Sequence, residues 1–431
     1  MNYNLIIIGG GPAGTGILFK AIKDGMFDIL CDRGIAIIEK TFHLMIGKMA
    51  DYQVNSDTRS DVFLECLEGN LQQILDLSQL NPEIEEIKSY NGVSIPLVLL
   101  RKYFMKLGDL LLEKVNKHPN CDVFLDSCST KINQIDNGKF MVSFNSSKKR
   151  MIIEGKHVVV ATGGTPSMKS DYYWDNGSKI SLDRFLYKTI HSDTLIRGNL
   201  NKDLFKKLKD NPSVVILGGG HSGFSSADYL LNNFKSFNFS QQSIKIYSRS
   251  PARIYFESEI EALKHNYKDF DKDDFCKITK RLYRLAGLRM DGRKLYMRML
   301  GMINNEKEER VVFKHKIENN KGLLKDINEA TIIIQALGYS FNILPCYDEF
   351  ENQISFIGEK TGRWVDNSCR LLNSNNEVVQ NLYAYGLSSG IIPSEELGGE
   401  PSFKGQTNGL WYYQNILAQV ILDQVLKRHY V

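Results

Sequence analysis

Two stretches of the chain repeat one pattern of apolar and polar positions. Residues 5–8 read Leu-Ile-Ile-Ile, residues 214–217 read Val-Val-Ile-Leu, and three glycines follow each run directly. An uninterrupted apolar run of this length is typical of a strand that is buried on both faces in a parallel sheet. A helix and a second strand are predicted after each glycine run, the second strands at 35–38 and 244–247. The pattern therefore predicts two βαβ units.

The remaining pattern predicts further elements of both kinds. Residues 41–91 are mixed, with short helical stretches such as 61–77, and we interpret them as an excursion from the first sheet. Apolar residues at helical spacing from Leu97 to Val115 predict a helix that faces the core. The other elements that we expect are a small antiparallel layer at 123–125 and 139–144, joined through an Asp136-Asn137-Gly138 turn, a parallel strand at 158–160, a strand at 331–334 and a closing amphipathic helix at 411–425.

The first glycine run contains the spacing Gly-x-Gly-x-x-Gly at Gly9, Gly11 and Gly14. The first glycine permits a tight turn, the second lets the backbone approach a pyrophosphate, and the third lets the helix pack close to the strand. Glu39 ends the next predicted strand, where a carboxylate can accept hydrogen bonds from ribose hydroxyls. This context predicts a dinucleotide site.

The second run repeats the spacing at Gly218, Gly220 and Gly223, with His221 and Ser222 inside the loop. No acid ends the following strand, and the sequence there contains Arg249 instead. A guanidinium would pair with a ribose 2′-phosphate, which a carboxylate would repel, so NADPH is favoured over NADH. Arg253 is a weaker candidate for the same role. We interpret His221 as a residue that fills the loop rather than as a catalytic base.

Composition and charge describe a folded protein of two or three domains. The 431 residues include 42% hydrophobic and 24% charged residues, and a net charge of +4 indicates neither a nucleic-acid nor a membrane partner. The segment from Lys277 to Arg298 holds eight basic residues and the single acid Asp291. A solvated helix face is the favoured interpretation of this run, and attraction of an anionic cofactor or substrate is the alternative.

Cysteine usage and the N-terminus favour a cytoplasmic protein. The seven cysteines are scattered and include no Cys-x-x-Cys pair, so neither a disulfide scaffold nor a local redox dithiol is indicated. No Cys/His cluster has metal-ligand spacing, and we expect no metal. A strand begins almost at the N-terminus, which leaves no room for a signal peptide, and no apolar run is long enough to cross a bilayer.

The two loops, the Ala161-Thr162-Gly163-Gly164 turn and its repetition at Ala336-Leu337-Gly338-Tyr339 resemble the two-dinucleotide-domain flavoproteins. That superfamily includes the glutathione-reductase-like disulfide reductases and the single-component flavin monooxygenases. Because no dithiol motif is present, the chain is more similar to the monooxygenases, especially the amine N-hydroxylases. Their Phe-x-Asn-Glu stretch reads Phe256-Glu257-Ser258-Glu259 here, and their C-terminal Gly-Asp reads Gly386-Leu387.

The resemblance implies an α/β fold with two Rossmann-like domains, the NADPH domain being inserted in the FAD domain. We expect the first part of the FAD domain at 1–165, the NADPH domain with its linker at 166–338 and the C-terminal part of the FAD domain at 339–431. The residues that would bind FAD are Gly9, Gly11, Pro12, Ala13, Gly14, Glu39, Lys40, Thr162, Gly163, Gly386, Gln406 and Thr407. Those that would bind NADPH are Gly218, Gly220, His221, Ser222, Gly223 and Arg249.

The resemblance also implies a reaction. NADPH would reduce FAD, oxygen would add at flavin C4a, and the nucleophilic atom of an amine-type small molecule would take the distal oxygen of the hydroperoxide. The cofactors would supply the difficult chemistry, so no catalytic side chain can be named. The alternatives are an NADPH-dependent flavoprotein reductase or oxidase without a dithiol, and a sensor or scaffold that binds FAD and NADPH. The oligomeric state, a homo-oligomer included, stays open.

Overall fold

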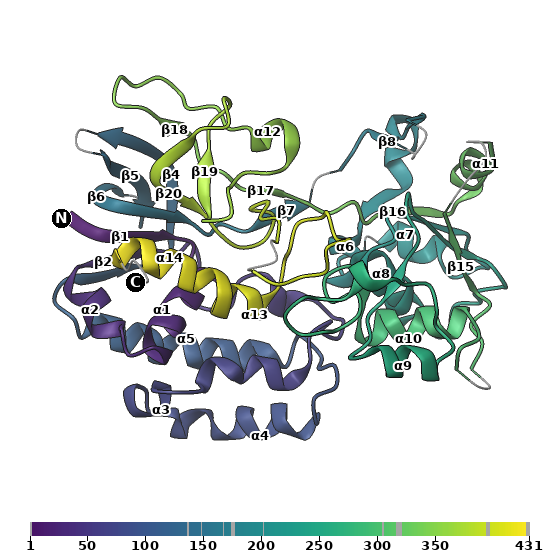
Figure 1. Ribbon diagram of the computed structural model, residues 1–431. Coiled ribbons are helices and arrows are strands. Elements are labelled where there is room, and N and C mark those ends of the chain that lie inside the picture. The colour runs from purple at the N-terminus through teal and green to yellow at the C-terminus, as the bar shows by residue number, and fades with distance from the viewer. Residues whose placement is uncertain are drawn as a thin grey trace.

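The chain forms two sheets that lie beside each other, each with its own helices (Figure 1). This computed structural model describes residues 2–135, 138–147, 149–166, 168–173, 177–200, 202–303, 306–315, 321–393 and 397–427. Asp136 and Asn137 of the predicted turn lie outside the described residues.

The first sheet is built around β1 (Asn2–Ile8), which pairs in parallel with β2 (Ile35–Ile38) and β6 (Lys149–Val160). The order of its main strands is β18-β4-β5-β6-β1-β2-β3, in which β3 spans Cys121–Phe124, β4 Ser127–Ile135, β5 Lys139–Ser146 and β18 Cys346–Tyr347. The second half of β6 pairs with β20 (Val378–Ala384), and β20 pairs with β19 (Arg370–Leu372). Strands from the two ends of the chain therefore share one sheet.

The prediction of an antiparallel layer is correct for 139–144 but wrong for 123–125. Val123 and Phe124 belong to β3, which pairs in parallel with β2 and forms the edge of the parallel sheet. Three of its four residues are only partly buried. An edge strand tolerates polar residues such as Asp122, so it lacks the uninterrupted apolar run that identifies an interior parallel strand.

Helices from distant parts of the chain cover this sheet. The predicted core-facing helix is α5 (Leu100–Asn116), and its fully buried side chains include Tyr103, Phe104, Leu107 and Leu111. Helix α1 (Gly14–Lys23) packs against α14 (Ala418–Leu426), which runs beside it in Figure 1. The remaining helices of this half are α2 (Phe27–Asp32), α3 (Leu71–Ile74), α4 (Asn81–Ser89), α12 (Gly358–Thr361) and α13 (Leu410–Tyr412).

The second sheet is entirely parallel, with the order β10-β16-β11-β12-β15. Its strands are β10 (Thr189–His191), β11 (Val214–Leu217), β12 (Ile244–Tyr247), β15 (Val311–Lys314) and β16 (Ile332–Gln335). Val214 and Ile216 belong to the core on one face, and Val215 and Leu217 to the core on the other. Both faces are covered, which explains the uninterrupted apolar run; each buried side chain contributes roughly 1.5–3 kcal/mol.

The helices of this half are α6 (Ser192–Ile196), α7 (Lys202–Lys207), α8 (His221–Asn233), α9 (Glu259–Lys264), α10 (Met290–Met299) and α11 (Lys321–Glu329). Short pairs of strands complete it: β8 (Asp171–Tyr173) with β9 (Lys179–Ser181), and β13 (Arg253–Ile254) with β14 (Gly287–Leu288).

A short ribbon connects the two halves. β7 (Gly164–Pro166) leads from the first sheet, β17 (Tyr339–Phe341) returns to it, and the two pair antiparallel with Gly164 opposite Phe341. In Figure 1 this ribbon lies between the two sheets.

Two helical predictions need correction. The predicted helix within 61–77 is a series of short 3₁₀ turns followed by the four-residue α3. The predicted helix at 411–425 contains a π-helical turn at Tyr413–Leu417 between α13 and α14. Tyr385 donates its hydroxyl hydrogen to the carbonyl of Tyr413 in that turn, and a side chain that inserts into the helical ladder accounts for such a bulge. No helix of the described residues has the length and hydrophobicity needed to cross a membrane.

Candidate functional site

The two outer glycines of the first loop have no room for a side chain. A Cβ on Gly14 would lie 2.0 Å from the carbonyl oxygen of Gly9, and one on Gly9 would lie 2.5 Å from that of Ala161. Gly9 also has φ of +102°, which favours glycine. Gly11 is different, because the nearest atom to its Cβ would be Gly47 Cα at 3.7 Å. The backbone at Gly11 is therefore open to the close approach of a ligand.

Glu39 lies directly after β2 and is only 7% exposed. Its carboxylate accepts hydrogen bonds from the backbone N–H of Gly10 at 2.7 Å and of Thr41 at 2.8 Å. Each carboxylate oxygen has a second lone pair, so these bonds fix Glu39 beside the loop and leave acceptor capacity for a ribose. Lys40 is exposed next to it.

The turn at Ala161–Gly164 lies against the first loop, as the contact between Ala161 and Gly9 shows. Thr162 donates its hydroxyl hydrogen to the carbonyl of Asn342 at 2.5 Å, and Asn342 donates its amide to the carbonyl of Thr162 at 3.2 Å. Gly163 has φ of +67° and no neighbour within 4 Å of a Cβ position. Thr162 and Gly163 therefore stand between the first loop and the ribbon.

The C-terminal segment, by which we mean the described residues from Gly386 to Asn408, also reaches the first loop. Gly386 follows β20, and a Cβ there would lie 3.0 Å from the Cβ of Ala13. Gln406 donates to the carbonyl of Gly362 at 2.8 Å, and Thr407 is buried. Asn408 accepts from the Ser388 N–H and the Tyr413 hydroxyl, both at 3.0 Å, and thereby ties this loop to the final helix.

The second loop repeats the geometry of the first. A Cβ on Gly223 would lie 2.0 Å from the carbonyl oxygen of Gly218, and one on Gly218 would lie 2.2 Å from that of Ala336. Gly220, like Gly11, is open, with no atom within 4 Å. Ala336 thus contacts the second loop as Ala161 contacts the first, which explains why the two turns have similar sequences.

Helix α8 begins at His221, inside the glycine loop, with Gly220 as its N-cap. The His221 Nε2 atom accepts a hydrogen bond from the backbone N–H of Arg289 at 3.2 Å. Burial lowers the pKa of His221, so the ring is neutral at physiological pH and its proton lies on Nδ1. Ser222 contributes its carbonyl to a bond with the Ser226 hydroxyl. These contacts support the interpretation of His221 as a residue that fills the loop.

A cavity of about 360 Å³ opens beside the second loop. Its walls include Gly219, Gly220, His221, Ser248, Arg253 and Phe403. Arg253 forms an ion pair with Asp269 at 2.6 Å and lies over the Tyr283 ring. Arg249 is exposed and is not part of the wall. The structure therefore brings the weaker of the two arginine candidates to the cavity.

The C-terminal segment closes this cavity on one side. Phe403 lies in its wall, and the Glu400 carboxylate accepts from the N–H groups of Leu285 and Ala286 at 2.8–3.1 Å. Burial raises the pKa of Glu400. A segment that contacts the first loop at Gly386 thus also contacts residues beside the second loop.

A buried polar cluster joins the two halves at another point, and no pattern in the sequence indicates it. Asp193 accepts from the hydroxyl of Tyr52 at 2.6 Å and from that of Tyr339 at 3.2 Å, and pairs with Arg197 at 3.0 Å. Burial and the neighbouring Asp193 raise the pKa of both tyrosines. Ser56, a few residues beyond Tyr52, donates its hydroxyl hydrogen to the carbonyl oxygen of Thr58.

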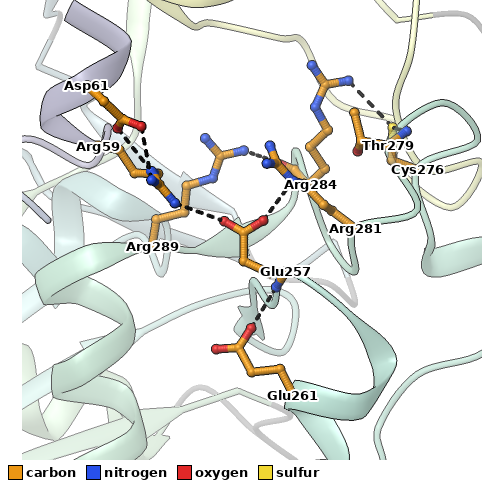
Figure 2. A network of polar contacts seen from close by, with 9 residues as sticks. All are labelled: Arg59, Asp61, Glu257, Glu261, Cys276, Thr279, Arg281, Arg284 and Arg289. Carbon is orange, nitrogen blue, oxygen red and sulfur yellow. Dashed lines mark hydrogen bonds and ion pairs between the residues drawn. The ribbon is translucent and has the colours of Figure 1, made fainter. Parts of the chain in front are cut away.

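The interpretation of 277–298 as a solvated helix face is wrong for most of the segment. Only the residues from Met290 on are helical. Arg284 is 9% exposed and lies over the Trp411 ring, while Arg281 and Arg293 pair with Glu257 and Glu261 at 2.8 and 2.6 Å. Figure 2 shows Glu257 between the guanidinium groups of Arg59 and Arg281, with Arg289 beside them, whereas the Arg284 guanidinium points away toward Cys276.

The described residues include no group of three or more His, Cys, Asp or Glu side chains arranged to hold a metal ion. Six of the seven cysteines are buried and one, Cys128, is exposed.

Comparisons with known proteins match the whole length of the chain. A hydroxylase from Streptomyces rubellomurinus, which acts on CMP-5′-(3-aminopropyl)phosphonate, is 25% identical over 438 aligned residues, 99% of this chain and 98% of that protein.

Solved structures of amine hydroxylases have the same fold. An ornithine N-hydroxylase from Kutzneria sp. 744, in complex with reduced FAD, NADP⁺ and L-ornithine, has a TM-score of 0.55 at 15% identity and covers 99% of this chain and 100% of its own. A FAD-bound cadaverine monooxygenase from Erwinia amylovora has a TM-score of 0.52 at 13% identity, covering 99% and 95%. The reduced ornithine hydroxylase of Pseudomonas aeruginosa has a TM-score of 0.53 at 12% identity, covering 99% of both chains.

These likenesses confirm the predicted α/β fold with two Rossmann-like sheets. The family model described as pyridine nucleotide-disulphide oxidoreductase matches residues 3–236, more than half of the chain. The chain is therefore a member of the pyridine nucleotide-disulphide oxidoreductase family, an oxidoreductase that binds FAD and a nicotinamide nucleotide.

Proposed function

We propose that the protein is a flavin monooxygenase that uses NADPH and oxygen to hydroxylate the nitrogen of a small-molecule amine. The observation that carries this proposal is the position of the C-terminal segment, which contacts the first loop at Gly386 and lines the cavity of the second loop at Phe403. A flavin on the first loop and a nicotinamide on the second would meet at this segment. The hydroxylase from Streptomyces rubellomurinus acts on an aminopropyl group, which supports an amine as the substrate.

The residues of the two loops fit the two cofactors. Gly11 and Gly220 leave open backbone where a pyrophosphate would approach, and Glu39 keeps acceptor capacity for the FAD ribose. FAD and NADPH, when bound, supply the electrons and the activation of oxygen. We assign Arg253, together with the predicted Arg249, to the 2′-phosphate of NADPH, because Arg253 lines the cavity and carries a guanidinium.

The division into domains is part of the proposal. Strands of the first sheet come from residues 2–160 and 346–384, and strands of the second from 189–335. This distribution supports an FAD domain at 1–165 and 339–431 with the NADPH domain at 166–338 inserted in it.

The protein's own groups position the reactants and exclude water. Asp193 and the two tyrosine hydroxyls fix the first half against the second, and Glu400 holds the C-terminal segment on the turn at Leu285. A seam held by buried hydrogen bonds keeps bulk water from the reacting atoms. Hydroxylation also requires an amine nitrogen with a free lone pair, which only the uncharged form of the amine has.

The positions of the thiols support oxygen chemistry over dithiol chemistry. Cys31 and Cys121 are neighbours, since the Cys121 thiol lies 3.5 Å from the carbonyl oxygen of Cys31. Cys121 begins β3, however, whereas the first glycine loop follows the end of the parallel strand β1. With a rise of about 3.3 Å per residue, four residues separate this pair from the loop edge of the sheet by roughly 10 Å or more.

The test is product analysis with isotopic oxygen. The FAD-loaded protein is incubated with NADPH, ¹⁸O₂ and, in turn, cadaverine, ornithine and 3-aminopropylphosphonate. The expected result is a hydroxylamine that carries one ¹⁸O atom, with NADPH consumed in proportion to the product. NADPH oxidation that yields only hydrogen peroxide for every amine would identify an oxidase, and negligible NADPH oxidation would identify a sensor or scaffold. Either result contradicts the proposal.

A further inference from the structure

Four arginine side chains lie beside the seam, the contact between the two halves that the Tyr52–Asp193 hydrogen bond marks. They come from two distant parts of the sequence. Arg59 comes from the excursion in the first half, and Arg281, Arg284 and Arg289 come from the turn before α10 in the second (Figure 2). The side chains of Arg59 and Arg281 are 44% and 42% exposed, so a ligand can reach them. The cluster is therefore an accessible concentration of positive charge between the two halves.

The acids present neutralise this charge only in part. The Asp61 carboxylate accepts two hydrogen bonds from the Arg59 guanidinium, at 2.9 and 3.0 Å. The Glu257 carboxylate forms ion pairs with two arginines, Arg281 at 2.8 Å and Arg59 at 3.8 Å. Within the described chain, no carboxylate lies within 4 Å of the guanidinium of Arg284 or of Arg289. The Arg284 guanidinium donates to the buried Cys276 thiol instead, and the buried Glu400 carboxyl lies near Arg289. Around Glu257, the three guanidinium groups of Arg59, Arg281 and Arg289 therefore face the carboxylates of Glu257 and Asp61, an excess of at most one positive charge.

Arg289 is the best placed of the four to receive a ligand. Its guanidinium lies over the Tyr255 ring and donates one hydrogen bond, to the carbonyl of Arg284. A guanidinium has five donors in a planar fork that matches two oxygens of a phosphate or phosphonate. The other N–H donors of Arg289 can provide that match, together with the Arg59 nitrogen that lies 3.8 Å from Glu257.

The cluster lies next to the place where the two cofactors would meet. The backbone N–H of Arg289 is bound to His221 in the second loop, and Arg284 lies over Trp411 at the start of the final helix. The cavity beside the second loop has Arg253 in its wall but none of these four arginines. The cluster is therefore near the seam but separate from the site that we assign to NADPH.

We propose that Arg59, Arg281 and Arg289 bind a phosphate or phosphonate group on the amine substrate. The inference deepens the proposed function and rests on it: the substrate would carry its amine at one end, toward the flavin, and its anionic phosphorus group at the other. Two oxygens of the phosphorus group would accept hydrogen bonds from one guanidinium fork, and added salt would weaken this binding.

The test compares two ligands on the FAD-loaded protein with saturating NADP⁺. Isothermal titration calorimetry measures the dissociation constants of 3-aminopropylphosphonate and of butylamine, an amine without an anionic group. The variants are Arg59→Gln, Arg281→Gln and Arg289→Gln. The matched control is Arg310→Gln, since Arg310 is 41% exposed and pairs with Glu308, away from the seam. Flavin absorbance and thermal melting verify that each variant is folded.

We expect 3-aminopropylphosphonate to bind at least tenfold more tightly than butylamine. Each of the three variants should weaken its binding about tenfold or more, the loss of one charge-assisted hydrogen bond, and leave butylamine binding unchanged. Arg310→Gln should leave both unchanged. In turnover, the variants should raise KM for the phosphonate with little change in kcat.

Two results would overturn the inference. One is equal binding of 3-aminopropylphosphonate by the unmodified protein and all three variants. The other is a matching loss of NADP⁺ affinity in the variants, which would assign the cluster to the nucleotide. The inference and the proposed function can fail separately. Arginine-dependent phosphonate binding without any hydroxylamine product would refute only the hydroxylase, and hydroxylation of amines with no preference for phosphorus would refute only the arginine site.

Discussion

Replacing single glycines of the two loops by alanine separates folding from cofactor binding. At Gly14 a methyl group would stand 2.0 Å from the carbonyl oxygen of Gly9, so the loop must move by more than 1 Å to restore an ordinary contact. The obstacle is backbone, which cannot rotate away as a side chain can. We therefore expect Gly14→Ala to lower the free energy of unfolding of the FAD-free protein by about 3 kcal/mol, the upper end of the usual cost of overpacking.

Gly11→Ala is the matched variant in the same loop. Its methyl group would be 3.7 Å from the nearest atom, an ordinary contact, so the free energy of unfolding should change by less than about 1 kcal/mol. The methyl group nevertheless occupies the place where the pyrophosphate would approach, and it would displace bonds worth about 1.5–3 kcal/mol each. The dissociation constant of FAD should rise about 10- to 100-fold.

The second loop provides an internal repeat of the experiment. Gly223→Ala, with its methyl group 2.0 Å from the carbonyl oxygen of Gly218, should destabilise, and Gly220→Ala, with no neighbour within 4 Å, should not. Both should weaken NADP⁺ binding and leave FAD binding intact. Urea unfolding of the cofactor-free proteins and fluorescence titrations with each cofactor measure the four variants. If Gly11→Ala destabilised the protein as much as Gly14→Ala, or bound FAD normally, the steric reasoning would be refuted.

Three further predictions concern individual side chains. Arg253→Gln should raise the dissociation constant of NADP⁺ about tenfold, by the loss of a charge-assisted bond, and leave NAD⁺ binding unchanged; equal effects on both nucleotides would contradict its assignment to the 2′-phosphate. Asp193→Ala removes the shared partner of Tyr52, Tyr339 and Arg197 and should lower the free energy of unfolding by about 1–3 kcal/mol in urea titrations, since the two partly buried hydroxyls lose their carboxylate acceptor while Arg197 keeps Asp51 at 3.7 Å. Burial and Asp291 raise the pKa of Asp228 from 3.8 to about 6, so the folded state holds this proton more tightly than the unfolded state. The stability of the unmodified protein should therefore fall by up to about 3 kcal/mol between pH 4 and pH 6 relative to Asp228→Asn, and parallel pH profiles would refute the assignment.

Features that depend on neighbours in the sequence were predictable. The loops at Gly9 and Gly218 and the acid at Glu39 each require a fixed spacing within one βαβ unit, and the structure has the corresponding strands and helices there. Edge strand β3 was placed in the wrong layer, because an edge position lacks the continuous apolar run of an interior strand.

Features that depend on distant residues could not be predicted. Tyr52 and Asp193 are 141 residues apart, and no local pattern indicates that they share a hydrogen bond. The same holds for Arg59 and Glu257, whose contact exists only because the two halves lie against each other. Arg253 was a weaker candidate than Arg249 because the sequence shows the end of a strand but not the direction in which the following turn brings a side chain.

If the second half is an inserted domain, as we propose, the β7–β17 ribbon makes it a removable module. Gly164 and Phe341 are paired across the ribbon, and paired residues of antiparallel strands have Cα atoms only about 5 Å apart. The chain thus leaves the first half and re-enters it at nearly the same point. A gene that joined these two positions through a two-residue hairpin turn would encode the first half alone, and the second half could be exchanged for that of a relative without moving any strand of the first sheet.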